Sequence, residues 1–298
     1  MIVNRPTLLT LGVGFHTAFN NGLGQGESLY PRIASRVPST TGEQEYGWLG
    51  KVPNIREWIG DRQVQNITSS SYRIRNKDWE LTLGVDRNDI EDDNIGIYGP
   101  LFQEMGSSVA SAYDRSVWAL LKAGFTTPCY DGQYFFDVDH PVLAEDGVTV
   151  RSVANTDGGT GAPWFLVDDK RTLKPIILQV RKDWQFVPKD KLDDDNVYHS
   201  KKFIYGVDGR YNVGYGFWQF SWGSKQPLTA AAYSAARAAL SGMTGDHGRP
   251  LGIVPRTLIV PPALEEVGRE ILQSERNEVG ATNPWRGTAE LVVVPWLT

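Results

Sequence analysis

The stretch DRNDIEDDNIGIYGPLFQEMGSSVASAYDRSVWALLKAGF, residues 86–125, carries the longest helical pattern in the chain. Pro100 suits a first helical turn, where its missing N–H is not needed, and Gly124 can end the helix. Between them apolar residues recur at close to helical spacing: Leu101, Met105, Val109, Ala112, Val117, Leu120 and Leu121. A helix over about 99–123 would be a rod of roughly 36 Å. Such a rod is long for a globular domain, so we expect it to be a spine to which the rest of the chain is attached.

The acidic lead-in to this helix is the first candidate site. It consists of four carboxylates, Asp89, Glu91, Asp92 and Asp93. Paired carboxylates can bind a metal ion or perform acid–base chemistry. The spacing does not fit a calcium loop, because neither Asp86 nor Asp89 as first ligand places Gly sixth and Glu twelfth. We favour a simpler interpretation, in which negative charge precedes a helix N-terminus because the helix dipole stabilises it there.

A second candidate site follows the helix. Its residues are Cys129, Asp131, Asp137, Asp139 and His140. The Asp and His side chains could bind the metal of a hydrolase, and Cys129 with His140 could act as nucleophile and base. Such pairs are defined by geometry, which a sequence does not show. We favour the alternative of a tightly turned loop with buried aromatic residues and polar caps.

Composition narrows the possible functions. The chain has 298 residues, a net charge of −5 and a single cysteine. A protein whose main task is to grip nucleic acid needs a basic surface, which this balance does not provide. One cysteine excludes internal disulfides and multi-thiolate metal sites. No stretch reaches the roughly 18 apolar residues of a membrane span, so we expect a soluble protein made in a cytoplasm, with no cofactor.

The N-terminal part is typical of an arm. Thr7–Phe19 can form a short amphipathic helix, and the glycine-rich run at 20–26 is expected to break it. A phosphate-binding loop would need a strand before the glycines, and here a helix precedes them. We therefore expect a mobile arm joined by a flexible linker.

Residues 43–85 form an extended, hairpin-like segment with few residues for a core of its own. Its clearest strand is Trp79–Val85, in which apolar residues alternate. A long hairpin alone is marginally stable, and no partner for it is obvious within the chain, so we expect it to lie across another subunit. Trp and Arg dominate many interfaces, and the candidates here are Trp48, Arg56, Trp58 and Arg62. The acidic cluster at 89–93 is a candidate partner for the arginines, within or between subunits.

In the second half of the chain, the predicted secondary structure changes at Pro227. Before it, strands are predicted at 164–167, 175–187, 202–207 and 211–222. After it, the pattern is a compact αβαβ lobe. Helices are predicted at 230–240 and 262–273, and strands at 256–260 and 290–296.

Several long segments of this chain resemble the major head (capsid) proteins of Mu-like transposable phages. The similarity runs through nearly the whole chain in the same order. The segments are YGWLGKVPNIREWIGDR (46–62), VDRNDIEDDNIGIYGPLFQEMG (85–106), CYDGQYFFDVDHPV (129–142), RPLGIVPRTLIVPPALE (249–265) and TNPWRGTAELVVVPWL (282–297).

The resemblance implies an α+β fold of the Hong Kong 97 type. Its parts would be an N-terminal arm at 1–37, an extended loop at 38–76, a peripheral domain at 77–226 and an axial domain at 227–298. The peripheral domain would contain the spine helix at about 99–123, and the strands between Trp164 and Trp222 would build its sheet.

The resemblance also implies a structural function rather than an enzymatic one. Copies of the chain would assemble in the host cytoplasm into hexamers and pentamers of an icosahedral virion head enclosing double-stranded DNA. Partners would be a portal, possible decoration proteins and a separate scaffolding protein, because the arm begins almost at Met1 and leaves little room for a scaffolding extension. No motif supports covalent crosslinking between subunits. The alternatives are a tail or baseplate component and the hydrolase at 131–140.

Overall fold

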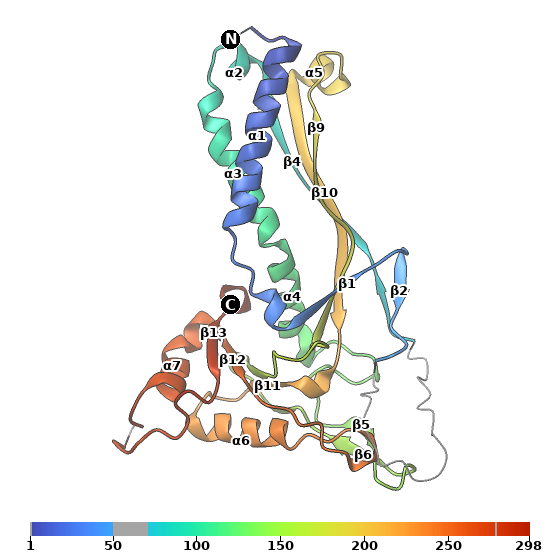
Figure 1. The fold of residues 1–298 in the computed structure, drawn as a ribbon, viewed down its shortest axis with the longest axis vertical. Helices are drawn as coiled ribbons and strands as arrows, with labels where there is room; N and C mark the ends of the chain where they lie inside the picture. Colours follow the sequence, from blue (N-terminus) through green and yellow to red (C-terminus); the bar gives the residue numbers. More distant parts are fainter. Residues whose placement is uncertain (1, 50–70, 278) are drawn as a thin grey trace.

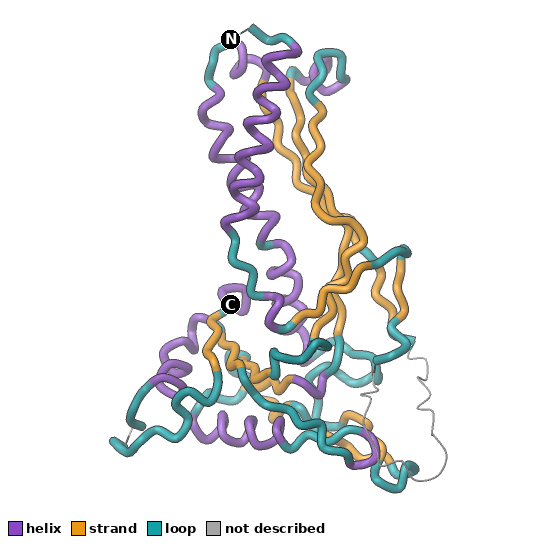
Figure 2. The backbone as a smooth tube through the Cα atoms, viewed as in Figure 1, coloured by secondary structure: helices purple, strands orange, loops and turns teal. Residues whose placement is uncertain are grey.

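The protein is an elongated stalk standing on a wider base (Figure 1). The computed structural model describes residues 2–49, 71–277 and 279–298. We use "stalk" for the helices α1, α3 and α4 with the four-stranded sheet beside them, and "base" for the five-stranded sheet with α6 and α7. Figure 2 shows the stalk as a helical layer lying along one face of its sheet.

The helices of the described residues are α1 Arg5–Gln25, α2 Arg87–Glu91, α3 Tyr98–Ala110, α4 Ala112–Lys122, α5 Asp195–Ser200, α6 Ala230–Ser241 and α7 Glu265–Gln273. The first six strands along the chain are β1 Ala34–Pro38, β2 Glu43–Glu45, β3 Arg73–Arg75, β4 Lys77–Asp86, β5 His140–Leu143 and β6 Val150–Val153. The remaining strands are β7 Thr156–Gly159, β8 Trp164–Val167, β9 Ile176–Lys189, β10 Lys202–Tyr215, β11 Ser221–Lys225, β12 Thr257–Val260 and β13 Glu290–Val293.

The predicted spine is present as two consecutive helices, α3 and α4, which meet at Ser111. The backbone hydrogen bonds continue across the junction, from Ser111 N–H to the Ser107 carbonyl and from Arg115 N–H to the Ser111 carbonyl. The Ser111 hydroxyl donates to the Ser108 carbonyl at 2.9 Å. A serine side chain that bonds to a nearby carbonyl competes with helical backbone geometry, which explains the local interruption of the predicted single rod.

The prediction of a helix break at 20–26 was wrong, because α1 runs on to Gln25 and packs along α3. Two glycines permit this close crossing. A Cβ added at Gly22 would lie 1.8 Å from the Gln103 carbonyl oxygen, and one added at Gly106 would lie 2.0 Å from the Phe19 carbonyl oxygen. The glycine-rich run is therefore a helix-packing surface, and the close contact with α3 outweighs the weak helix propensity of glycine.

The stalk sheet has the order β1-β9-β10-β4, with β1 parallel to β9 and the other pairs antiparallel. The predicted strand Trp79–Val85 is confirmed within β4, and Val85 pairs with Phe203 of β10. The core of the upper stalk lies between this sheet and the helices. There the Phe15 ring stacks on Phe102 at 4.4 Å between centroids and meets Tyr205 edge-on at 5.3 Å.

The predicted strand at 211–222 is divided between the two sheets. β10 ends at Tyr215, a 3₁₀ turn covers Trp218–Phe220, and β11 then enters the base. Gly216 occupies the crossing point, where an added Cβ would lie 2.3 Å from the Lys174 carbonyl oxygen. The chain can pass this point only with a residue that lacks a side chain.

The base sheet has the order β13-β12-β8-β11-β7. The order of elements predicted after Pro227 is confirmed, including the Thr229 cap of α6, whose hydroxyl accepts from Ala232 N–H at 3.1 Å. The strand predicted at 290–296 is shorter, because β13 ends at Val293 and Pro295–Leu297 form a 3₁₀ turn. The helix predicted at 262–273 begins with a 3₁₀ turn, Pro262–Leu264, before α7. The prediction that all strands between Trp164 and Trp222 build one sheet was wrong for β8. That strand pairs with β11 and β12 in the base, and its four residues are buried because both of its faces are covered.

Candidate functional site

The loop after the spine brings three of its five candidate residues together in the interior. Asp131 lies between the other two. One of its carboxylate oxygens accepts from the Cys129 thiol at 3.0 Å, and the other lies 2.7 Å from Nδ1 of His140. His140 is fully buried and stacks on Trp218 with 3.9 Å between ring centroids. The three potential metal-ligand atoms lie within 4.8 Å of one another.

The electrostatics of this cluster suit a structural function. Burial, and then the Asp131 carboxylate, raise the pKa of the Cys129 thiol well above its usual range. Burial alone would raise the pKa of Asp131, but the hydrogen bonds from His140 and Cys129 outweigh it and lower that pKa. A nucleophilic thiol needs a lowered pKa and a base beside it. Here the thiol faces a carboxylate and remains protonated, so the arrangement holds a loop together rather than activating a nucleophile.

The other two candidates of this loop point elsewhere. The Asp137 carboxylate accepts from the backbone N–H groups of Tyr134 and Val138, at 3.2 and 2.7 Å. Asp139 lies beside it, and partial desolvation together with the neighbouring carboxylate raises the pKa of Asp139. These contacts are those of a tightly turned loop, the interpretation favoured from the sequence.

The acidic cluster, Asp89, Glu91, Asp92 and Asp93, lies at the end of the stalk away from the base (Figure 1), and only two of its four carboxylates have partners within the described part of the subunit. The Asp89 carboxylate accepts from the Tyr98 hydroxyl, and Glu91 forms an i,i+4 ion pair with Arg87 at 2.8 Å. Asp92 and Asp93 are exposed, and neither carboxylate is hydrogen-bonded or ion-paired to another residue of the described part of the chain. The cluster therefore leaves two carboxylates available to a partner outside the subunit.

Of the aromatic and arginine candidates, only Trp48 is described. Its ring is half-buried, 5.9 Å from Tyr46 and 5.8 Å from Phe217 between centroids, and it packs against the main core. Arg56, Trp58 and Arg62 lie outside the described residues.

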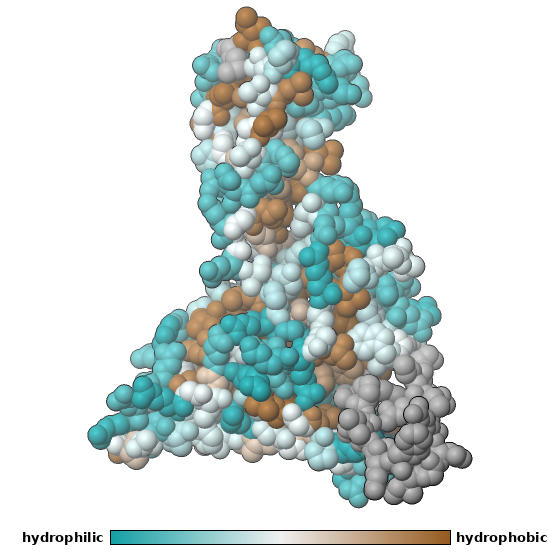
Figure 3. Space-filling view, in the orientation of Figure 1, coloured by the Kyte–Doolittle hydropathy of each residue, from teal (hydrophilic) through white to brown (hydrophobic). Residues whose placement is uncertain are grey.

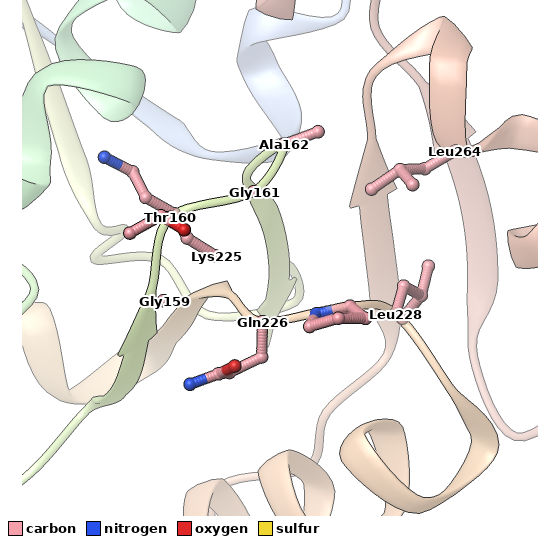
Figure 4. A pocket seen from close by; sticks show the side chains of 9 residues that line it. Gly159, Thr160, Gly161, Ala162, Lys225, Gln226, Leu228 and Leu264 are labelled. Atoms are coloured by element: carbon pink, nitrogen blue, oxygen red, sulfur yellow. The ribbon is translucent and has the colours of Figure 1, made fainter.

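The base contains a pocket of about 290 Å³ (Figure 4). Nine residues line it: Gly159, Thr160, Gly161, Ala162, Lys225, Gln226, Pro227, Leu228 and Leu264. Lys225 is the one ionisable residue among them, and its Nζ lies 4.5 Å over the Phe125 ring. Backbone and apolar side chains dominate the lining, and no pair of groups suited to acid–base chemistry faces this space.

The segment after α1 makes polar contacts, with α4 and with the base, that the sequence did not reveal. Asp114 of α4 is buried, and one carboxylate oxygen accepts from Leu29 N–H, Tyr30 N–H and Trp118 Nε1. A weak signal was present, since an Asp four residues before a Trp lies on the apolar face of the predicted spine. Arg32, in the same segment as Leu29 and Tyr30, reaches the base and donates to Asp169 at 3.3 Å and to Glu290 at 2.6 Å.

None of the helices formed by the described residues is long and apolar enough to cross a membrane.

Comparison with known proteins places this geometry in a family. The model of the Mu-like prophage major head subunit gpT matches residues 8–297. The major capsid protein of Escherichia phage Mu is 39% identical over 305 residues, covering 100% of both chains. The Mu-like prophage FluMu major head subunit of Haemophilus influenzae is 45% identical over 271 residues, covering 89% of this chain and 88% of its own.

The solved structures agree with the sequence relatives. The capsid protein in the procapsid of bacteriophage JBD30 superposes with a TM-score of 0.88 at 39% identity, over 99% of this chain and 100% of that one. The Hong Kong 97-type fold expected from the sequence is confirmed by this match. The chain belongs to the family of Mu-like major head subunits and is a major capsid protein, a structural component of a phage head.

Proposed function

We propose that copies of this chain tile an icosahedral phage head as hexamers and pentamers enclosing double-stranded DNA. The observation that carries the proposal is the agreement of the whole chain with the capsid protein of an assembled procapsid. We further propose that the subunit has no catalytic role. The Cys129–Asp131–His140 cluster supports this, because the Asp131 carboxylate bonds to both other side chains and the thiol is held protonated.

The partners of the shell also belong to the proposal. Assembly would take place in the host cytoplasm, around a separate scaffolding protein and a portal, with decoration proteins possible outside. A net charge of −5 is consistent with weak contact to packaged DNA, since a strongly basic lining would bind it tightly. We keep the proposed division into arm (1–37), extended loop (38–76), peripheral domain (77–226) and axial domain (227–298) with one change. The strands β7, β8 and β11 move from the peripheral to the axial domain, because they share a sheet with β12 and β13.

We propose that the extended loop reaches a neighbouring copy through Trp48, Arg56, Trp58 and Arg62. The carboxylates of Asp92 and Asp93 support such a contact, because they have no partner among the described residues of their own subunit. The strands β2 and β3, which flank the segment at 50–70, lie toward the base, whereas α2 lies at the opposite end of the stalk (Figure 1). This separation favours a contact between copies over one within a copy.

The test is particle assembly by charge-reversed variants. Arg56→Glu or Arg62→Glu should lower the yield of shells seen by electron microscopy while circular dichroism shows a folded subunit. If the acidic cluster is the partner, Asp92→Lys should restore assembly to one of the reversed arginine variants, whereas Asp193→Lys, at another exposed carboxylate, should not. Wild-type particle yield from both arginine variants would contradict the contact. Tubes or rings from the wild-type chain would instead indicate a tail component.

A further inference from the structure

The outer face of α1 lacks the charge that a water-facing helix normally carries. From Pro6 to Gly26 the chain has no Asp, Glu, Lys or Arg. One side of the helix is buried through Leu8, Phe15 and Phe19. On the other side Leu9 is 54% exposed and Val13 is 68% exposed. Surface helices normally place charged residues opposite their apolar stripe, so this face has the composition of a contact surface.

Two glycines of α1 differ in their surroundings: Gly22 faces α3, and Gly14 faces away from the subunit. Gly22 is required within the subunit, because its Cβ would overlap the backbone of α3. Gly14 has no such requirement, since a Cβ there would meet nothing within 4 Å. Glycine in a helix interior is less stable than alanine, so a position with open space above it gains nothing from glycine inside the subunit. A close approach from outside the subunit would account for it.

The neighbouring helix extends the apolar character of this end of the stalk. Ile97, just before α3, and Leu101 in its first turn are both about half exposed. Figure 3 shows hydrophobic residues over the helices of the upper stalk, between more hydrophilic flanks. The outer α1 face is thus part of a broader apolar region rather than a single exposed side chain.

The absence of charge indicates what kind of partner this face fits. When two copies of one chain meet about a two-fold axis, the same surface lies on both sides of the contact. A surface carrying charge of one sign would repel its own copy, whereas an uncharged face with small residues allows two helix backbones to approach closely. We propose that the outer face of α1, formed by Leu9, Thr10, Val13, Gly14 and Thr17, packs antiparallel against the same face of a second copy in the shell. This inference rests on the proposed shell assembly.

A disulfide crosslink tests the contact directly, because the one natural cysteine, Cys129, is buried. Val13→Cys and Gly14→Cys lie at the centre of the face, so thiols in two facing copies would come within disulfide reach, about 7 Å between Cα atoms. Oxidation of assembled particles should give a covalent dimer on a non-reducing gel. The matched control is Val187→Cys on β9, an exposed valine at 51% that lies outside the face and should give no dimer.

Charge repulsion provides a second readout. Val13→Asp should reduce particle yield at least several-fold while the subunit stays folded, and Val187→Asp should assemble like wild type. If shells form normally from Val13→Asp and Val13→Cys gives no dimer, the inference fails while the proposed function stands. A crosslink to a different protein of the particle overturns it in favour of that partner. If the wild-type chain forms no shells, the proposed function fails and this inference fails with it.

Discussion

The upper stalk and the base bury their apolar side chains in different ways. The upper stalk has a small core of its own, in which α1 and α3 cover one face of the sheet near Phe203 and Tyr205. The base shares a larger core that covers both faces of β8 and continues into the lower stalk around Trp118. The upper stalk therefore depends on a single layer of helices, whereas the base has several elements that support one another.

This difference indicates that α1 can separate from α3 in the upper stalk while the base stays folded. Removing α1 from α3 would open the upper core to water, because Leu8, Phe15 and Phe19 of α1 are buried in it. The base contains no residue of that cluster, so its protection against hydrogen exchange should be independent of it. The following predictions run from the largest expected effect to the smallest.

The largest effect is expected from Gly106→Leu. Its Cβ would lie 2.0 Å from the Phe19 carbonyl oxygen and 2.7 Å from Leu23 N, so α1 can no longer pack at its present distance. We expect a loss of about 3 kcal/mol in the free energy of unfolding, at the upper end of overpacking effects. Hydrogen exchange should show loss of protection in α1 and unchanged protection in β8 and β12.

Gly14→Ala is the matched control for that variant. Its Cβ would meet nothing within 4 Å, and alanine is the better helix former by about 1 kcal/mol. The isolated subunit should therefore be slightly more stable. Equal destabilisation by Gly106→Leu and Gly14→Ala would contradict the difference between the inner and outer faces of α1.

The next largest effect is expected from Asp114→Ala in α4, whose carboxylate holds the segment after α1 against the spine. The change leaves three N–H donors, of Leu29, Tyr30 and Trp118, without their carboxylate acceptor in a buried site. We expect a cost of about 2–3 kcal/mol, as for other buried hydrogen bonds to a charged group. Urea unfolding measures it, with Asp193→Ala as the exposed control, expected to stay within about 0.5 kcal/mol of wild type. Similar losses from both variants would show that the hydrogen bonds to Asp114 contribute no more than an exposed carboxylate does.

The smallest effect concerns acid and Asp131. The pKa of Asp131 is lower in the folded protein than in the unfolded chain, where the pKa of an Asp is about 3.9. It therefore contributes stability above that unfolded pKa, and the contribution is lost as the pH falls through the lower folded pKa. Asp131→Asn should cost about 1 kcal/mol at pH 6 and less near pH 3. Denaturant unfolding at both pH values tests this, and a loss that does not change with pH would assign the effect to packing instead of ionisation.

Much of the local structure could be predicted because it follows from short-range patterns. The Thr229 cap, the alternation from Trp79 to Val85 and the apolar spacing after Pro100 each act within a few residues. The candidate loop at 129–140 was also recognised as a group. What Cys129, Asp131 and His140 do there could not be predicted, because it depends on distances of 2.7 and 3.0 Å between side chains and on burial beneath Trp218.

The sequence by itself determined where the longer helices and most strands lie and, through its long matching segments, the capsid family. Only the tertiary structure decided the function of the glycines at 20–26. Local propensity predicts a break there, and close packing on Gly106 keeps the helix intact. The tertiary structure also decided which sheet β8 joins and which carboxylates of the acidic cluster remain available to a partner. Both depend on contacts between residues far apart in the chain, and local sequence patterns carry no information about such contacts.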